Sequence, residues 1–189
     1  MIMYSSDRLK IIAVTSRQLC PRPLWEQIPR IRQAGISSII LREKDLSEDD
    51  YLRLAEKVFR ACVENNVELT IHNYPQVAKK LGISRIHMPL PLLNVNTTHE
   101  FETAGTSIHS LQQLKQAELL NVSYVTCGHI FATDCKKGLK PRGISFLYDI
   151  CNESSVPVFA IGGITKERIS EISETGAAGA CIMSSAMLL

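Results

Sequence analysis

The chain has 189 residues, of which 45% are hydrophobic and 21% charged, with a formal net charge of +2. This composition is typical of a folded globular protein and excludes a disordered chain. The small net charge argues against a nucleic-acid-binding protein, and no apolar run approaches the roughly 18 residues of a membrane-spanning helix. We therefore expect one domain over residues 1–189, with no nucleic acid and no membrane among its partners.

Six cysteines are scattered along the chain, and no two of them form a C-x-x-C pair. Most of them lie inside apolar patterns, and the first ten residues are too polar for a signal peptide. We interpret the cysteines as reduced thiols in a cytoplasmic protein. They are Cys20, Cys62, Cys127, Cys135, Cys151 and Cys181.

Strand-like and helix-like patterns alternate from the N-terminus. Ile11–Thr15 is an apolar, β-branched run that predicts a buried strand. Leu24, Ile28 and Ile31 have helical spacing, and Gly35 is a plausible end of that helix. The same alternation predicts further strands at 36–41, 68–72, 83–87, 106–108, 124–127, 157–161 and 180–183, with helices between most of them.

Local signals refine some of these boundaries. Ser47 should cap the helix that follows the second strand, with Asp50 close to a capping-box position. Gly128 should break the sixth strand, and Thr165 should cap a helix that runs through Thr175. The two prolines in residues 88–92 should exclude helix there.

Eight strands that alternate with helices predict an α/β protein, specifically a (β/α)8 TIM barrel. The chain is short for a barrel, and it stops at Leu189, so the eighth helix should be largely missing. An open doubly wound sheet is the alternative architecture.

His129 is the first ionisable side chain beyond the sixth predicted strand. It is followed by a long cationic loop that includes Lys136 and ends near Gly143. Ligands of parallel α/β proteins bind at that end of the strands, and an imidazole titrates near neutral pH. His129 is therefore a candidate for proton transfer, although a histidine that only packs or caps is the plainer interpretation.

Other polar residues also follow predicted strands. Arg42 could hold a carboxylate or a phosphate with two hydrogen bonds, or it could pair with Glu43 or with a helix carboxylate. Asn73 and His109 also stand at strand ends, where they could line the same mouth of a barrel.

Two segments after the last two strands suit a phosphate group. In TIM barrels these loops often bind phosphate through backbone N–H groups, and glycine permits a close approach. A tight turn and helix caps are the alternative interpretation. The segments are Gly162-Gly163 and Ser184-Ser185.

The sequence contains no convincing metal or nucleotide motif. The histidines are dispersed, the cysteines near His129 lack zinc-type spacing, and there is neither a P-loop nor a G-x-G-x-x-G segment. We expect no metal ion and no cofactor.

The segment from Gly128 to Gly138 reads GHIFATDCKKG, and it resembles the motif G-H-[VI]-F-x-T-D-C-K-K-G of the TenI-type thiazole tautomerases, within the thiamine phosphate synthase superfamily. The resemblance extends in chain order over most of the sequence. It includes residues 40–44 (ILREK), 107–110 (SIHS), 160–164 (AIGGI) and 182–184 (IMS).

This resemblance implies a (β/α)8 barrel that isomerises a non-aromatic carboxythiazole phosphate, a small phosphorylated thiazole, to its aromatic tautomer in thiamine biosynthesis. It implies that His129 moves the proton, that Arg42 binds the substrate carboxylate with Ser107 nearby, and that no cofactor is required. By the same resemblance the phosphate would be held by Gly162, Gly163, Ser184 and Ser185.

Two alternatives remain open. The first is a magnesium-dependent thiamine phosphate synthase, which joins a thiazole phosphate to a pyrimidine diphosphate. The resemblance implies that true synthases carry proline at the position of His129 and acidic residues after strands three and four, where this chain has His72-Asn73-Tyr74 and residues 88–92 (MPLPL). The second is a non-catalytic barrel that binds thiamine phosphates and regulates a partner. A missing outer helix would expose apolar strand surface, so we also expect a homo-oligomer, specifically a dimer.

Overall fold

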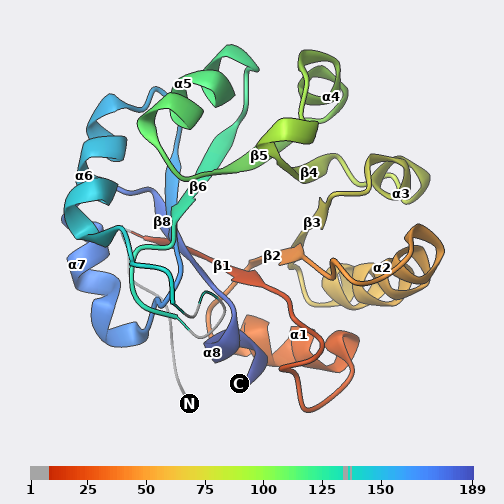
Figure 1. Ribbon diagram of the computed structural model, residues 1–189. Coiled ribbons are helices and arrows are strands. Elements are labelled where there is room, and N and C mark those ends of the chain that lie inside the picture. Colours follow the sequence, from red (N-terminus) through yellow and green to blue (C-terminus); the bar gives the residue numbers. More distant parts are fainter. Residues whose placement is uncertain (1–8, 134–135, 137) are drawn as a thin grey trace. The chain divides into compact units, whose positions relative to one another are not determined.

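The computed structural model describes residues 9–133, 136 and 138–189. Within these residues, eight strands are hydrogen-bonded in chain order from β1 to β8 as a closed barrel (Figure 1). This confirms the (β/α)8 TIM barrel and excludes the open doubly wound sheet. The strands are β1 (Lys10–Val14), β2 (Ser38–Leu41), β3 (Glu68–His72), β4 (Arg85–Pro89), β5 (Thr103–Ile108), β6 (Tyr124–Gly128), β7 (Val158–Ile161) and β8 (Gly179–Ile182).

Helices separate the strands along the chain, and the last of them is a single turn, as the sequence predicts. None of the helices in the described part of the chain is both long and apolar enough to cross a membrane. The helices are α1 (Leu24–Gln33), α2 (Glu48–Glu64), α3 (Pro75–Lys80), α4 (Val95–Glu100), α5 (Leu111–Leu119), α6 (Gly143–Glu153), α7 (Ile169–Ser173) and α8 (Ser184–Met187), with 3₁₀ turns η1 (Leu90–Leu92) and η3 (Lys166–Arg168).

The described residues fall into two compact units. The first comprises residues 11–87 and 183–189, and it contains α1, α2, α3 and α8. The second comprises residues 9–10 and 88–182, and it contains β5 to β8 with α4 to α7. The expectation of one domain over residues 1–189 stays a prediction.

Helix α2 is the longest helix of the first unit, and its start follows the sequence prediction. The Ser47 hydroxyl accepts a hydrogen bond from the backbone N–H of Asp50 at 3.2 Å, which satisfies one of the free donors of the first turn. Residues at helical spacing then bury one face of α2 against its unit. These residues are Tyr51, Ala55, Val58 and Cys62.

Helix α1 holds the C-terminal turn of the chain within the same unit. The side chain of Gln27 is fully buried, and its amide nitrogen donates to the Ala186 carbonyl of α8 at 2.8 Å. On another side of α1, the Lys57 ammonium of α2 lies 4.6 Å from the centre of the Trp25 ring. The short α8 is therefore anchored by a buried polar contact from α1.

Each of the five residues of strand β6, in the second unit, is buried. It pairs in parallel with β5 and with β7, and Gly128 lies opposite Ile161. The strand thus extends one residue beyond the predicted range of 124–127 and ends at Gly128. Gly128 is its last residue, because the absence of a side chain lets the backbone pass Ile161, whose carbonyl oxygen would be 2.1 Å from a β-carbon.

Two local predictions need correction, and one helix is additional to those predicted. Thr165 stands before η3, but its side chain makes no capping hydrogen bond and instead bonds the Glu167 carboxylate. Residues 88–92 are not free of helix, since Leu90–Leu92 forms a 3₁₀ turn that accommodates proline in its first positions. Helix α4 was not expected, because its residues are weak helix formers; the Asn94 side chain caps it.

Candidate active site

His129 directly follows β6, in the second unit, and is buried. The backbone after it continues along the end of β7. Ile130 donates to the Ile161 carbonyl and Phe131 to the Gly162 carbonyl, both at 3.0 Å. The position of His129, predicted from the strand pattern, is thus fixed by backbone pairing on one side.

The Gly162-Gly163 turn packs against this segment. A β-carbon on Gly162 would lie 2.3 Å from the β-carbon of His129, and one on Gly163 would lie 2.4 Å from the Ala132 carbonyl oxygen. Both glycines have positive φ, 100° and 65°. The turn is required for the close packing of His129, whether or not it also binds phosphate.

The His129 ring has one hydrogen-bond partner among the described residues, and this partner assigns its tautomer. Nε2 lies 3.3 Å from the Leu139 carbonyl oxygen, which can only accept. The neutral ring therefore carries its proton on Nε2 and has a lone pair on Nδ1. Such an imidazole can accept a proton at Nδ1.

A pocket of about 260 Å³ opens beside His129. Its wall is strongly cationic, and we expect it to favour an anionic ligand. The sequence predicts Lys136 as a binding residue and indicates a basic loop, to which Lys140 and Arg142 belong; Leu139 has no such signal in the sequence. Asp134, Cys135 and Lys137 of the same loop lie outside the described residues. The pocket is lined by His109, Gly128, His129, Lys136, Leu139, Lys140 and Arg142.

His109 follows β5 and lines this pocket. Its Nδ1 lies 2.5 Å from the Gly128 carbonyl oxygen. Burial is the main cause that lowers the pKa of His109, the hydrogen bond opposes it, and the charges of Lys136 and Arg142 lower it further. Nearby in β5, the Ser107 hydroxyl accepts a hydrogen bond from Thr126 at 2.9 Å.

Arg42 belongs to the first unit and follows β2. Its backbone N–H donates to the Thr15 hydroxyl at 2.9 Å. Within the described residues its neighbour Glu43 pairs with Arg17, at 3.2 Å, so the predicted alternative of an Arg42–Glu43 pair is wrong. The Arg42 guanidinium makes no ion pair with a described residue.

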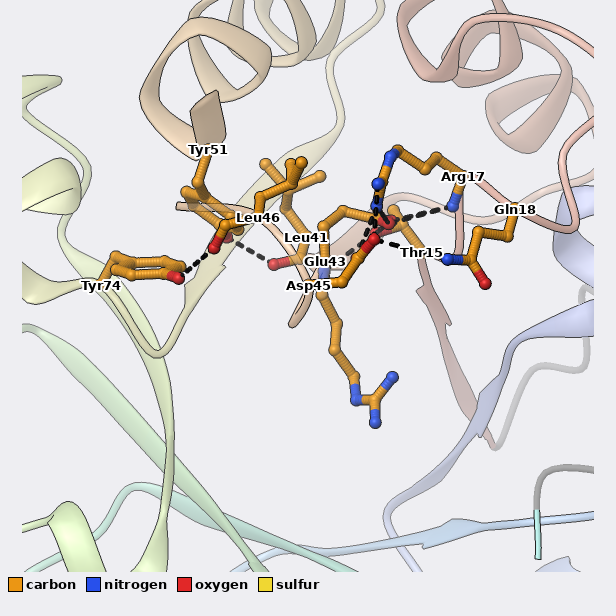
Figure 2. A network of polar contacts seen from close by, with 10 residues as sticks. Thr15, Arg17, Gln18, Leu41, Glu43, Asp45, Leu46, Tyr51 and Tyr74 are labelled. Atoms are coloured by element: carbon orange, nitrogen blue, oxygen red, sulfur yellow. Dashed lines mark hydrogen bonds and ion pairs between the residues drawn. The ribbon is translucent and has the colours of Figure 1, made fainter. Parts of the chain in front are cut away.

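Glu43 organises the polar network that holds this loop (Figure 2). It is only 3% exposed, and it accepts from the Thr15 hydroxyl at 2.7 Å and from the Arg17 backbone N–H at 3.0 Å. Arg17 extends the network to Asp45, and this hydrogen bond lowers the pKa of Asp45 to about 2. From α2, the Tyr51 hydroxyl donates to the carbonyl of Leu41, the last residue of β2, at 2.5 Å.

Asn73 follows β3 in a left-handed conformation, with φ of 69°. Its side-chain Oδ1 is buried and has no hydrogen-bond partner among the described residues. Beside it, the rings of His72 and His87 stack with centroids 5.9 Å apart. Burial lowers the pKa of His72 to about 4 and that of His87 to about 3, so both rings are neutral near pH 7. The end of β3 therefore carries a neutral imidazole and an amide, and His87 within β4 adds a second neutral imidazole.

Ser184 and Ser185 are the first residues of α8 in the first unit. Ser184 is exposed and Ser185 is half-buried. Across residues 9–133, 136 and 138–189, no group of three or more His, Cys, Asp or Glu side chains could hold a metal ion.

The sequence matches a family profile described as thiamine monophosphate synthase over residues 11–186. It is 30% identical to a thiamine-phosphate synthase of Syntrophomonas wolfei over 98% of this chain and 91% of that protein. It is 27% identical to a thiamine-phosphate synthase of Pyrococcus horikoshii over 98% of this chain and 90% of that protein. A solved structure of a thiamine phosphate pyrophosphorylase from Pyrococcus furiosus superposes with a TM-score of 0.82 at 23% identity, covering 95% of this chain and 88% of that one, which supports the barrel fold.

Proposed function

The chain belongs to the thiamine monophosphate synthase family, and from this premise we propose that it is a TenI-type thiazole tautomerase. The reaction removes a proton from ring carbon C2 of the non-aromatic carboxythiazole phosphate and adds one to the exocyclic carbon. Aromatisation makes it favourable, and it needs no cofactor. The observation that carries the proposal is His129, a buried imidazole in a cationic pocket with an available lone pair on Nδ1.

The mechanism uses one imidazole twice. Nδ1 of His129 takes the C2 proton, and the same nitrogen then returns a proton to the exocyclic carbon, so the enzyme ends in its starting state. Negative charge develops on the substrate after the first transfer. Lys136, Lys140 and Arg142 line the pocket and favour that charge.

The remaining predicted residues would bind the substrate. Arg42 is the proposed partner of the carboxylate, with Ser107 and Asn73 as hydrogen-bonding groups and His109 and Lys136 at the reacting end. The unpartnered Oδ1 of Asn73 supports a role in accepting a hydrogen bond from a ligand. The proposed phosphate ligands are Gly162, Gly163, Ser184 and Ser185.

Thiamine phosphate synthase is the second candidate, and the names of the relatives favour it. That reaction uses a magnesium–pyrophosphate complex, which requires oxygen donors and above all carboxylates. β3 ends at His72 with Asn73 after it, and β4 ends in Met88 and Pro89 with Leu90–Leu92 after it; among these side chains only that of Asn73 offers an oxygen. These residues do not fit the ion, and we derive no step that uses it.

The deciding experiment incubates the purified protein with the non-aromatic carboxythiazole phosphate, without added metal, and follows the absorbance of the aromatic product. We expect turnover above the spontaneous rate that is lost in His129→Gln and kept in His99→Gln, which changes an exposed histidine of α4. Wild-type rates in His129→Gln would reject the role of His129.

A second assay supplies thiazole phosphate, pyrimidine diphosphate and magnesium. Formation of thiamine phosphate without tautomerisation would establish the synthase instead. Tight binding of the aromatic product with neither activity would favour a regulatory barrel.

The homodimer and the cytoplasmic location stay predictions from the sequence. Sedimentation velocity over a range of protein concentrations tests the dimer. A single species with a mass near 21.1 kDa at every concentration would contradict it.

A further inference from the structure

We propose that His109 is a positioning residue that fixes His129 through the peptide between Gly128 and His129. This inference rests on the proposed function, since it assigns a role to His109 in the same pocket. The carbonyl of Gly128 is the group through which His109 acts, because that carbonyl belongs to the peptide that carries the backbone N–H of His129.

The geometry assigns the direction of this contact. A carbonyl oxygen only accepts, so the 2.5 Å contact requires a proton on Nδ1 of His109. Its neutral ring therefore has the opposite tautomer to His129, with the lone pair on Nε2. On the other side of His129, Ile130 donates to the Ile161 carbonyl at 3.0 Å. The His129 backbone is thus held on both sides, by the side chain of His109, which follows β5, and by the backbone of β7.

His109 is itself held at the start of α5. Its backbone N–H donates to the side-chain oxygen of Gln113 at 2.6 Å, and the Ser110 hydroxyl caps the helix by accepting from Gln113 N–H at 3.2 Å. A rigid helix start therefore supports the imidazole. A group that is fixed in this way can transmit its position to Gly128.

The charge of the pocket keeps His109 suited to this role. Burial lowers its pKa, and the cationic Lys136, Arg142 and protonated His129 all disfavour a second positive ring. A proton taken up by His129 during the reaction further disfavours protonation of His109, and Nδ1–H of His109 is the donor in either charge state. The bond to Gly128 is therefore unchanged through the cycle.

Two substitutions at one position separate positioning from simple packing. In His109→Asn, the side-chain NH₂ takes the place of Nδ1–H and can still donate to Gly128, whereas His109→Ala cannot. We expect kcat to fall about tenfold in His109→Ala, with a much smaller change in KM, and to recover most of that loss in His109→Asn. Equal losses in the two variants would overturn the proposal.

Imidazole ¹⁵N spectra provide a readout that does not depend on turnover. We expect His109 to carry its proton on Nδ1 and His129 on Nε2 near neutral pH. In His109→Ala the His129 signals should shift toward a mixture of tautomers, and in His109→Asn they should keep their wild-type positions. An Nε2–H tautomer at His109 would contradict the proposed positioning role. His129 signals that are the same in His109→Ala as in the wild type would also contradict it.

The two readouts also distinguish this proposal from the proposed function. If wild type shows no tautomerase turnover, the proposed function fails, and the spectra still decide whether His109 orients His129. If turnover depends on His129 but neither readout responds to His109→Ala, only the positioning role fails.

Discussion

Gly162 packs directly against His129, so the conformation of one residue constrains the other. Gly162 has φ of 100°, and the β-carbon of His129 occupies the space that a side chain on Gly162 would need. A glycine here has two functions, since it permits the backbone conformation and it leaves space for the imidazole. The orientation of the proposed base therefore depends on a residue without a side chain.

Gly162→Ala should damage both stability and activity. The added β-carbon would lie 2.3 Å from that of His129, so we expect a loss of about 3 kcal/mol in the free energy of unfolding and at least about a tenfold loss in kcat. Gly82→Ala is the matched control, because Gly82 also has positive φ, 67°, but its β-carbon would meet nothing within 4 Å. Urea unfolding and the tautomerase assay measure the two effects. Equal losses of stability in both variants would show that backbone strain, rather than the contact with His129, dominates.

The stacked rings of His72 and His87 should make the stability of the protein depend on pH. Both pKa values lie below the usual 6.5, at about 4 and about 3, so the unfolded chain binds more protons than the folded one between those values and 6.5. The contribution of these two rings to the free energy of unfolding should therefore be complete above pH 6.5. The free energy of unfolding should then fall, by a few kcal/mol, as the pH drops toward 4. His87→Phe should flatten this fall, which urea titrations at several pH values can measure. An equally steep fall in the variant would assign the pH dependence to other groups.

At the scale of elements, the loop between β2 and α2 depends on one buried carboxylate. Glu43 accepts hydrogen bonds from Thr15 and Arg17, both of which belong to the segment after β1. Because Thr15 also accepts from the Arg42 backbone, the network sets the course of the chain at Arg42. We infer that Glu43 acts on ligand binding only through the position of this loop.

Glu43→Ala should therefore destabilise the protein and weaken substrate binding. It leaves the Thr15 hydroxyl and the Arg17 backbone N–H without a partner, which costs about 2–4 kcal/mol of the free energy of unfolding, and it should raise KM more than it lowers kcat. Asp45→Ala is the control. It removes an exposed partner of the same arginine, and we expect no measurable change in the urea midpoint. A loss of stability in Asp45→Ala as large as in Glu43→Ala would contradict the central role of Glu43.

The elements that the sequence predicts best are those with strong local signals. The β-branched run at Glu68–His72 matches β3 at both ends, and the Ser47 cap marks the start of α2. Helix α4 lacked such a signal; it is stabilised by its cap and by the burial of Thr98 and the adjacent Phe101. Short segments of this kind are determined by packing, which a single sequence does not display.

The same reasoning applies to the candidate site. His129 could be located because it is the first titratable residue after a clear strand. The partner of Glu43 could not, because Arg17 is 26 residues away while Arg42 is adjacent. Likewise, the path of the basic loop decides that Lys140 and Arg142 line the pocket. Contacts between loops are the part of the site that spacing along the chain does not determine.

For the whole molecule, the open question is whether the two compact units unfold together. Cys62 belongs to the first unit and Cys127 and Cys181 to the second. Burial raises the pKa of each of these thiols to about 12, so their thiolates are scarce and inaccessible in the native state. They therefore serve as reporters of unfolding in each unit.

We expect the three buried thiols to become alkylated at one common urea midpoint, as one cooperative domain requires. Mass spectrometry of peptides after pulsed alkylation measures the midpoint at each site. The partly exposed Cys20 should react before unfolding and is the internal control. A midpoint for Cys62 clearly apart from that of Cys127 and Cys181 would show that the units unfold separately.

The contact between Trp25 and Lys57 has a practical consequence for spectroscopy. Trp25 is the only tryptophan of the chain, and it lies beside α2 in the first unit, while His129 and its pocket lie in the second. Intrinsic fluorescence excited at the indole band therefore observes the packing of α1 against α2. A tryptophan introduced beside His129 would add an emission that reports directly on that pocket.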